Sequence, residues 1–168
     1  MYRISSVAIF GKFLVALVAI VVIQGILGLR FRVFEYFDLP LVFAVYYGFT
    51  LGKPIPCMLI GSGLGLMQDS LSGAAMGTNG FSKTLIAYLA ASAVSKLNVD
   101  QPIARILALF LFTLGDGLVI SILGLVVGPT PGLQSTGPVF GWLLTATFNT
   151  LLGLVMFGYH DRLGHATA

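Results

Sequence analysis

Charged side chains are scarce in this chain. Lysine, arginine, aspartate and glutamate together make up 9% of its 168 residues, whereas a soluble domain usually carries about 25%. Hydrophobic residues make up 57%, and the mean hydropathy over the whole length is +0.99. Because a soluble fold needs polar side chains to cover its outside, this composition predicts a membrane protein whose surface faces lipid.

Cysteine and histidine are nearly absent, which excludes several kinds of site. Cys57 is the only cysteine, so no internal disulfide can form, and the two histidines, His160 and His165, both follow the last apolar run. A structural zinc ion needs about four ligands, so we expect no metal. The nine basic residues are scattered singly and the net charge is +3, so we expect no nucleic-acid partner.

The elements of an active site are also missing. No nucleophile has a neighbouring base, and no two acids are suitably spaced for shared acid and base work. The glycines of 61–63 and 73–77 are not followed by the Lys-Ser or Lys-Thr of a phosphate loop. The sequence therefore predicts a protein that is not an enzyme, with no catalytic residue and no cofactor.

What the chain does contain is a series of apolar runs separated by short polar, Gly-rich or Pro-rich connections. A helix needs about 20 residues to cross a bilayer, so the pattern predicts one all-α polytopic domain over residues 1–168, with about six transmembrane helices in one bundle. The expected spans are 7–29, 39–52, 57–71, 80–97, 103–127 and 138–159. We expect the first to be an uncleaved helix, because no small-residue cleavage site follows it. The second is short, so five spans are the alternative.

Basic residues near the ends of these spans indicate their orientation. With a cytoplasmic N-terminus, six basic residues lie inside (Arg3, Lys12, Lys53, Lys96, Arg105 and Arg162) and three lie outside (Arg30, Arg32 and Lys83). Positive residues concentrate on the cytoplasmic side of membrane proteins. We therefore expect both termini to lie in the cytoplasm.

Glycine is abundant, with 21 residues. Helices in lipid associate through close backbone contact, which small residues four positions apart on one face permit. The chain offers three such pairs, Gly48/Gly52, Gly61/Gly65 and Ala87/Ala91. Two interpretations stay open: these faces pack against helices of this protein, or one of them, with the third span as the candidate, receives the transmembrane helix of a partner.

Three charged residues are expected at membrane depth, namely Asp69, Lys83 and Asp116. Each costs about 2.5–3.5 kcal/mol on insertion scales unless it finds a partner. We predict that Asp69 pairs with Lys83 and joins the third and fourth spans, the alternative being separate solvation at the interface. We also predict a hydrogen bond between Asp116 and Asn149. A structural clamp there is favoured over a proton relay, because the spans contain no His or Glu.

One stretch of the sequence resembles a known family. Gly65-Leu-Met-Gln-Asp-Ser-Leu-Ser-Gly73, followed by Gly77-Thr-Asn-Gly-Phe-Ser-Lys-Thr-Leu85 and Tyr88-Leu89, is similar to the signature of the rod shape-determining protein MreD family. The total length and the predicted six spans are also similar. The resemblance implies a non-enzymatic subunit of the bacterial cell-elongation machinery in the inner membrane. Its expected partners are MreC, the actin-like MreB, the glycosyltransferase RodA and a penicillin-binding transpeptidase, together with membrane lipid.

MreC-type partners have a single membrane helix, which a small-residue face of this chain would bind. The candidate residues for partner binding or for structure are Gly61, Gly65, Gln68, Asp69, Gly73, Gly77, Lys83, Asp116 and Asn149.

The main alternative is a substrate-binding subunit like the S components of energy-coupling factor transporters, whose helical arrangement the MreD family is thought to share. Such subunits couple through an Ala-x-x-x-Ala surface on the first helix, whereas Ala16 and Ala19 are three positions apart. An intramembrane enzyme is the third class, and it is disfavoured because only isolated acids are available for it.

Overall fold

Every regular element of the residues described by the computed structural model is helical. The structure describes residues 18–19, 21–26, 30, 36–72, 75–94, 101–128 and 139–166, without the side chains of 127, 139 and 159–166. The main helices are α2 (Leu39–Leu51), α3 (Pro54–Ser72), α4 (Thr78–Ala93), α5 (Pro102–Val127) and α6 (Val139–Ala166). Residues 18–19 and 21–26 are helical as well. The predicted all-α class is therefore confirmed.

Local signals explain where the second and third helices begin. Asp38 caps α2, because its Oδ1 accepts a hydrogen bond from the Leu41 N–H at 3.0 Å. Gly52 ends α2 in the left-handed conformation, with φ of 57°. The third helix begins at Pro54, three residues before the predicted start, since a proline fits in the first turn, where its missing N–H needs no partner.

The other predicted limits agree to different degrees. Helix α6 continues to Ala166, past the predicted end at residue 159. Helix α4 ends at Ala93, and residues 95–97 of the predicted span lie outside the described residues. Most of the predicted first span and the connector 129–138 also lie outside them.

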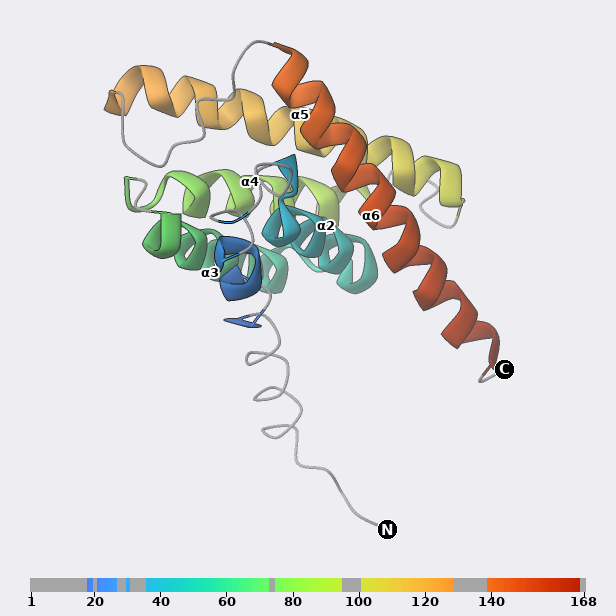
Figure 1. Cartoon of the computed structure of the whole chain (residues 1–168). Helices are drawn as coiled ribbons and strands as arrows, with labels where there is room; N and C mark the ends of the chain where they lie inside the picture. Colours follow the sequence, from blue (N-terminus) through green and yellow to red (C-terminus); the bar gives the residue numbers. More distant parts are fainter. Residues whose placement is uncertain are drawn as a thin grey trace.

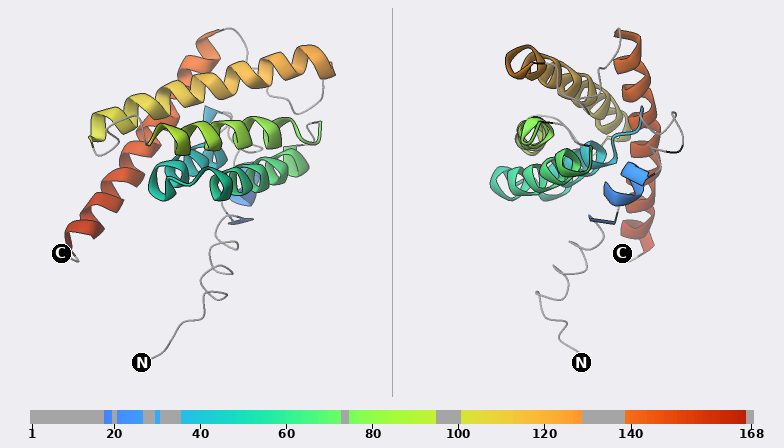
Figure 2. Two further views of the ribbon diagram at one scale, coloured as in Figure 1. Left: turned by 180° about the vertical axis from the view of Figure 1, so that it is seen from behind. Right: turned by 60° about the vertical axis from the view of Figure 1, so that its left-hand side comes forward.

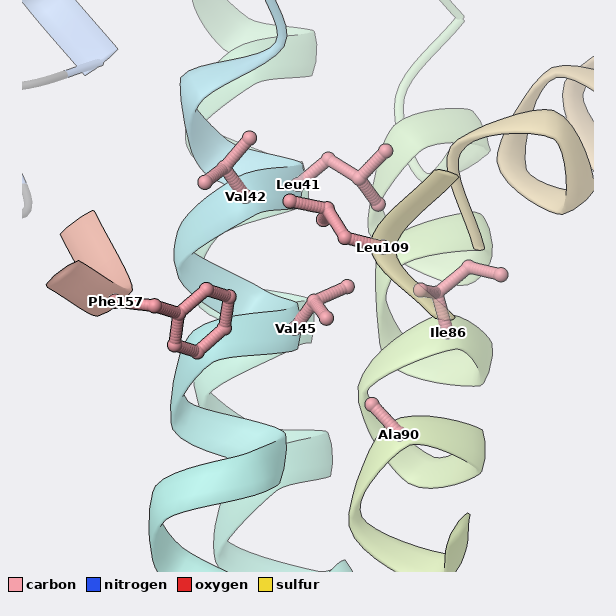
Figure 3. Close-up of a cluster of buried hydrophobic side chains, with 7 residues drawn as sticks. All are labelled: Leu41, Val42, Val45, Ile86, Ala90, Leu109 and Phe157. Carbon is pink, nitrogen blue, oxygen red and sulfur yellow. The ribbon is translucent and has the colours of Figure 1, made fainter. Parts of the chain in front are cut away.

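Helices α2, α3 and α4 lie side by side, and α3 and α4 share the most extensive contact (Figure 1). Helix α5 lies along α4 on the side away from α3, and α6 crosses steeply over α5 and α2 (Figure 2). Two apolar clusters fill the spaces between the helices. In one of them, Leu109 of α5 and Phe157 of α6 meet side chains of α2 and α4 (Figure 3). The other contains Val21, Ala44, Cys57, Leu64, Ala87 and Ala91.

The close contact of α3 with α4 depends on two glycines. A Cβ at Gly61 would overlap the backbone carbonyl of Lys83, and a Cβ at Gly65 would overlap that of Asn79 and lie 2.6 Å from Gly80 Cα. A Cβ at Gly63, between them in sequence, would meet no atom of the described residues within 4 Å. The Gly61/Gly65 face therefore packs inside this protein, and the hypothesis that this face receives a partner helix is wrong because α4 already occupies it.

Three charged side chains are buried beside the apolar core, and many large apolar side chains are exposed. Asp69, Lys83 and Asp116 are buried, with 4% exposure or less, whereas large apolar side chains such as Ile103, Leu125 and Val155 are more than 70% exposed. Exposed large apolar side chains occur on all four of α3, α4, α5 and α6, and on α4 the most exposed is Phe81 at 57%.

Two of the described helices are long and apolar enough to cross a membrane, over Pro102–Val126 and Phe140–Gly158. Helix α2 has 13 residues, which at 1.5 Å per residue is about 20 Å, less than the hydrocarbon thickness of about 30 Å. Helices α3 and α4 carry polar residues that lower their hydropathy. Helix length and composition therefore do not establish the predicted six spans.

Candidate functional site

Polar side chains from several helices meet in the middle of the bundle. We call this set the polar junction. Its members are Gln24 from the helical residues 21–26, Asp38 before α2, Asp69 on α3, Asn79, Ser82 and Lys83 on α4, Asp116 on α5 and Asn149 on α6. The described part of each helix thus contributes at least one polar group, or the residue that caps it, to a single network.

Lys83 lies at the centre of the polar junction and is 0% exposed. Its Nζ is 2.9 Å from Asp38 Oδ2 and 3.8 Å from Asp116 Oδ2. It also donates to Asn79 Oδ1 at 3.1 Å, one helical turn earlier on α4. An ammonium group buried in an apolar bundle is tolerated only when anionic and polar acceptors surround it. These contacts supply them.

Asp69 has a different role from the predicted one. Its two carboxylate oxygens accept from the backbone N–H groups of Gly77, Asn79 and Gly80 at 2.8–3.1 Å, and from Asn79 Nδ2 at 2.9 Å. The first turn of a helix leaves N–H groups without intrahelical partners, and α4 has no side-chain cap of its own. Asp69 therefore caps α4 from the neighbouring helix.

The predicted ion pair of Asp69 with Lys83 is not formed. The side chain of Asn79 stands between them, donating to Asp69 Oδ1 and accepting from Lys83 Nζ. The prediction failed because the unpaired N–H groups at the start of α4 lie next to the carboxylate and bind it, whereas Lys83 is one turn farther along the helix.

Asp69→Asn tests this cap. The variant keeps one oxygen but replaces the other with an NH₂ group, which would face N–H donors of the α4 N-terminus. Each buried donor that loses its acceptor costs about 1–3 kcal/mol where water does not reach it. We expect a lower melting temperature in detergent, followed by the fluorescence of Trp142, the only tryptophan. Ser70→Ala, at an exposed position next to it, is the control, and an equal melting temperature for the two variants would contradict the cap.

Asp38 connects three other elements. Besides capping α2 and pairing with Lys83, its backbone N–H donates to Asn149 Oδ1 at 2.9 Å. The side chain of Gln24 binds the backbone on both sides of Asp38, donating to the Phe37 carbonyl at 2.6 Å and accepting from the Leu39 N–H at 3.0 Å. These bonds join the helical residues 21–26 and α6 to the start of α2.

The predicted hydrogen bond between Asp116 and Asn149 is also absent. Asp116 Oδ1 accepts from Ser82 Oγ at 2.5 Å instead, and Asn149 binds the backbone of Asp38. Both residues do lie in the polar junction, joined through Asp38 and Lys83. The sequence showed that both are buried polar groups but not which helix each of them faces.

The remaining predicted residues have separate positions. Gly77 precedes α4 with φ of 99°, a conformation that favours glycine. Gln68 is half-buried, and its Oε1 has no hydrogen-bond partner among the described residues. Gly73 lies outside the described residues.

Sequence reasoning missed Gln24, Asp38, Asn79 and Ser82 as members of the junction. For Asp38 a signal existed, because an aspartate two residues before a proline at the start of an apolar run is typical of a helix cap.

The acidic side chains of the polar junction contact other groups of this chain. Asp69 binds the α4 N-terminus, and Asp38 and Asp116 face Lys83. The described residues contain no group of three or more His, Cys, Asp or Glu placed to hold a metal ion.

Comparisons with known proteins add no relative: no family model matches the chain, and no curated protein or solved structure is significantly similar to it.

Proposed function

We propose that this chain is a non-enzymatic, membrane-embedded scaffold subunit of the bacterial cell-elongation machinery. The observation that carries the proposal is the position of the residues in the Gly65–Leu89 signature. Gly65, Asp69, Gly77, Asn79 and Lys83 build the α3–α4 contact and the polar junction. A signature made of packing and capping residues fits a scaffold protein, whose role is to present a stable binding surface to its partners.

The distribution of charge supports a position inside the bilayer. In the described residues, Asp69, Lys83 and Asp116 lie inside and many large apolar side chains are exposed, which suits a hydrocarbon solvent. The two longest apolar helices support the same conclusion. Only 33% and 22% of their apolar windows are buried in the structure, whereas the core helix of a soluble protein is mostly buried. We propose that all six predicted spans cross the inner membrane, the shorter ones with help from their packed neighbours.

The partner in this proposal is a single-span protein of the MreC type. Small residues let two membrane helices approach closely. Since α4 occupies the Gly61/Gly65 side of α3, the partner helix would use the opposite side. There Gly63 has open space around it, and Leu59 is 70% exposed.

Co-purification tests the scaffold function. The tagged chain is expressed with the MreC-like protein of the same organism, and the complex is isolated in mild detergent. We expect the partner to be retained, because burial of apolar helix surface and small-residue packing hold the two together. The matched control is the same partner with its membrane helix replaced by an unrelated apolar helix, which should be lost.

Three outcomes would overturn the proposal or a part of it. Absence of the partner from the purified complex would remove the scaffold function. Equal retention of the native and the replaced membrane helix would remove the helix-binding mode. If the purified chain were instead strongly stabilised by a vitamin, the transporter alternative would replace the proposal.

A further inference from the structure

Large apolar side chains are exposed where helix α3 ends and helix α4 begins. Leu71, Met76 and Phe81 are 54%, 78% and 57% exposed, and we call these three side chains the hairpin tip. No charged residue occurs between Asp69 and Lys83 in the sequence, and both of these are buried. Exposed apolar groups at one end of a bundle point to contact with lipid or with another protein.

The backbone at the start of α4 needs no water for its N–H groups. All five from Gly77 to Phe81 have acceptors inside the chain. Three of them bind the Asp69 carboxylate, and those of Thr78 and Phe81 bind backbone carbonyls. A helix usually leaves the N–H groups of its first turn to water or to a cap. In lipid there is no water to bind them, so internal acceptors become a requirement.

Hydroxyl groups near the hairpin tip are satisfied in the same way. Those of Ser70, Ser72 and Thr84 each donate to a backbone carbonyl of their own helix, at 2.6–3.5 Å. The side chain of Ser70 is exposed, yet it binds the carbonyl one turn earlier on α3. These hydroxyl donors are thus provided for without solvent.

The length of the hairpin limits how far its tip can reach. Lys53 is exposed directly before α3 and marks one boundary of the bilayer in the membrane position proposed above, on which this inference rests. The 19 residues of α3 and the 16 of α4 extend about 28 and 24 Å. Both lengths are below the hydrocarbon thickness of about 30 Å, and any tilt of the helices shortens their reach further.

We propose that the hairpin tip stays in the lipid of the leaflet opposite Lys53, where its three side chains contact acyl chains, and that the turn does not emerge into water. Lipid is the occupant that requires no hydrogen bond, and the N–H groups of Gly77 to Phe81 are already bound within the chain. Helix α5 ends at the same end of the bundle (Figures 1 and 2), where Leu125 and Val126 are 87% and 80% exposed. Exposed apolar side chains at this end are therefore not confined to the hairpin.

Spin labels on single cysteines test the depth of the hairpin tip. One label is attached to Met76→Cys at the tip and one to Lys53→Cys at the other end of α3. A third, on Leu111→Cys, lies near the middle of the apolar window of α5, at a side chain that is 57% exposed. Cys57 is replaced by alanine in all three variants. The protein is reconstituted in vesicles of phosphatidylcholine and phosphatidylglycerol, and relaxation of each label by oxygen, which concentrates in lipid, is compared with relaxation by a water-soluble nickel chelate.

We expect the ratio of oxygen to nickel accessibility at Met76 to resemble that at Leu111 and to be several times higher than at Lys53. A low ratio at Met76 with a high ratio at Leu111 overturns this inference and leaves the membrane position intact. Low ratios at both positions remove the membrane position itself, and with it the proposed function. If the Met76→Cys variant does not fold, Leu71→Cys at the same tip replaces it and must give the same high ratio.

Discussion

Replacing Lys83 by methionine is expected to destabilise the protein more than any change of charge at its surface. The substitution leaves two carboxylates without their counter-charge, that of the buried Asp116 and that of Asp38, whose side chain is 15% exposed. Removing one partner from a buried ion pair costs about 3–5 kcal/mol in soluble proteins, because the remaining charge stays desolvated. Melting of the detergent-solubilised protein, followed by Trp142 fluorescence, measures the loss.

The matched control is Lys53→Met, which removes the exposed lysine between α2 and α3 and should change the stability by no more than about 0.5 kcal/mol. A rescue variant separates charge from shape. Asp38→Asn keeps an oxygen to cap α2 but removes one of the two carboxylates that face Lys83. We expect the double variant Lys83→Met/Asp38→Asn to be more stable than the sum of the two single losses predicts. Strict additivity, or equal effects of the two lysine substitutions, would mean that the buried pair contributes nothing.

The sequence predicted the helices because each depends on local signals. Apolar runs of sufficient length, bounded by glycine, proline and polar residues, placed α2 within one residue of its observed limits. The errors at α3 and α6 have local causes too. The expected start at residue 57 follows from treating Pro54 and Pro56 as a break, although both fit in a first turn. The expected end at residue 159 follows from the end of the apolar run, although charged residues continue a helix readily once it leaves the apolar region.

The buried polar residues could be predicted as a group but not as pairs. In a chain with so few charges, Asp69, Lys83, Asp116 and Asn149 had to find polar partners inside, and the structure brings all four into one junction. Which groups pair depends on how the helices rotate and cross, and a helical sequence does not encode that locally. Asn79 shows the difficulty, since one amide side chain separates two residues that charge alone would have paired.

The packing role of the glycines of α3 also could not be predicted from the sequence. Gly61, Gly63 and Gly65 are equivalent by composition and local pattern. Their difference comes from the position of α4. The backbone of α4 approaches Gly61 and Gly65, whereas Gly63 has open space around it. That difference permits a test in which the same substitution, glycine to alanine, gives opposite results at positions two residues apart on one helix.

Gly65→Ala is expected to force α3 and α4 apart. The new methyl group would overlap the carbonyl group of Asn79 and approach Gly80 Cα, and these backbone atoms cannot move without shifting the whole first turn of α4. Overpacking of a tight contact costs about 1–3 kcal/mol and occasionally more. The loss here should reach the upper part of that range, because the same displacement draws the Asp69 carboxylate away from the N–H groups that it caps.

Gly63→Ala provides the control, since it adds the same methyl group to the same helix where nothing lies within 4 Å. Alanine favours a helix over glycine by about 0.5–1 kcal/mol, so this variant should melt at the same or a slightly higher temperature than the wild type. Gly61→Ala should behave like Gly65→Ala, because its methyl group would meet the Lys83 carbonyl and Ala87 Cβ. The double variant Gly61→Ala/Gly65→Ala should lose less than the sum, since helices separated at one point already leave room at the other. Equal melting temperatures for Gly65→Ala and Gly63→Ala would show that α3 and α4 do not meet along this face.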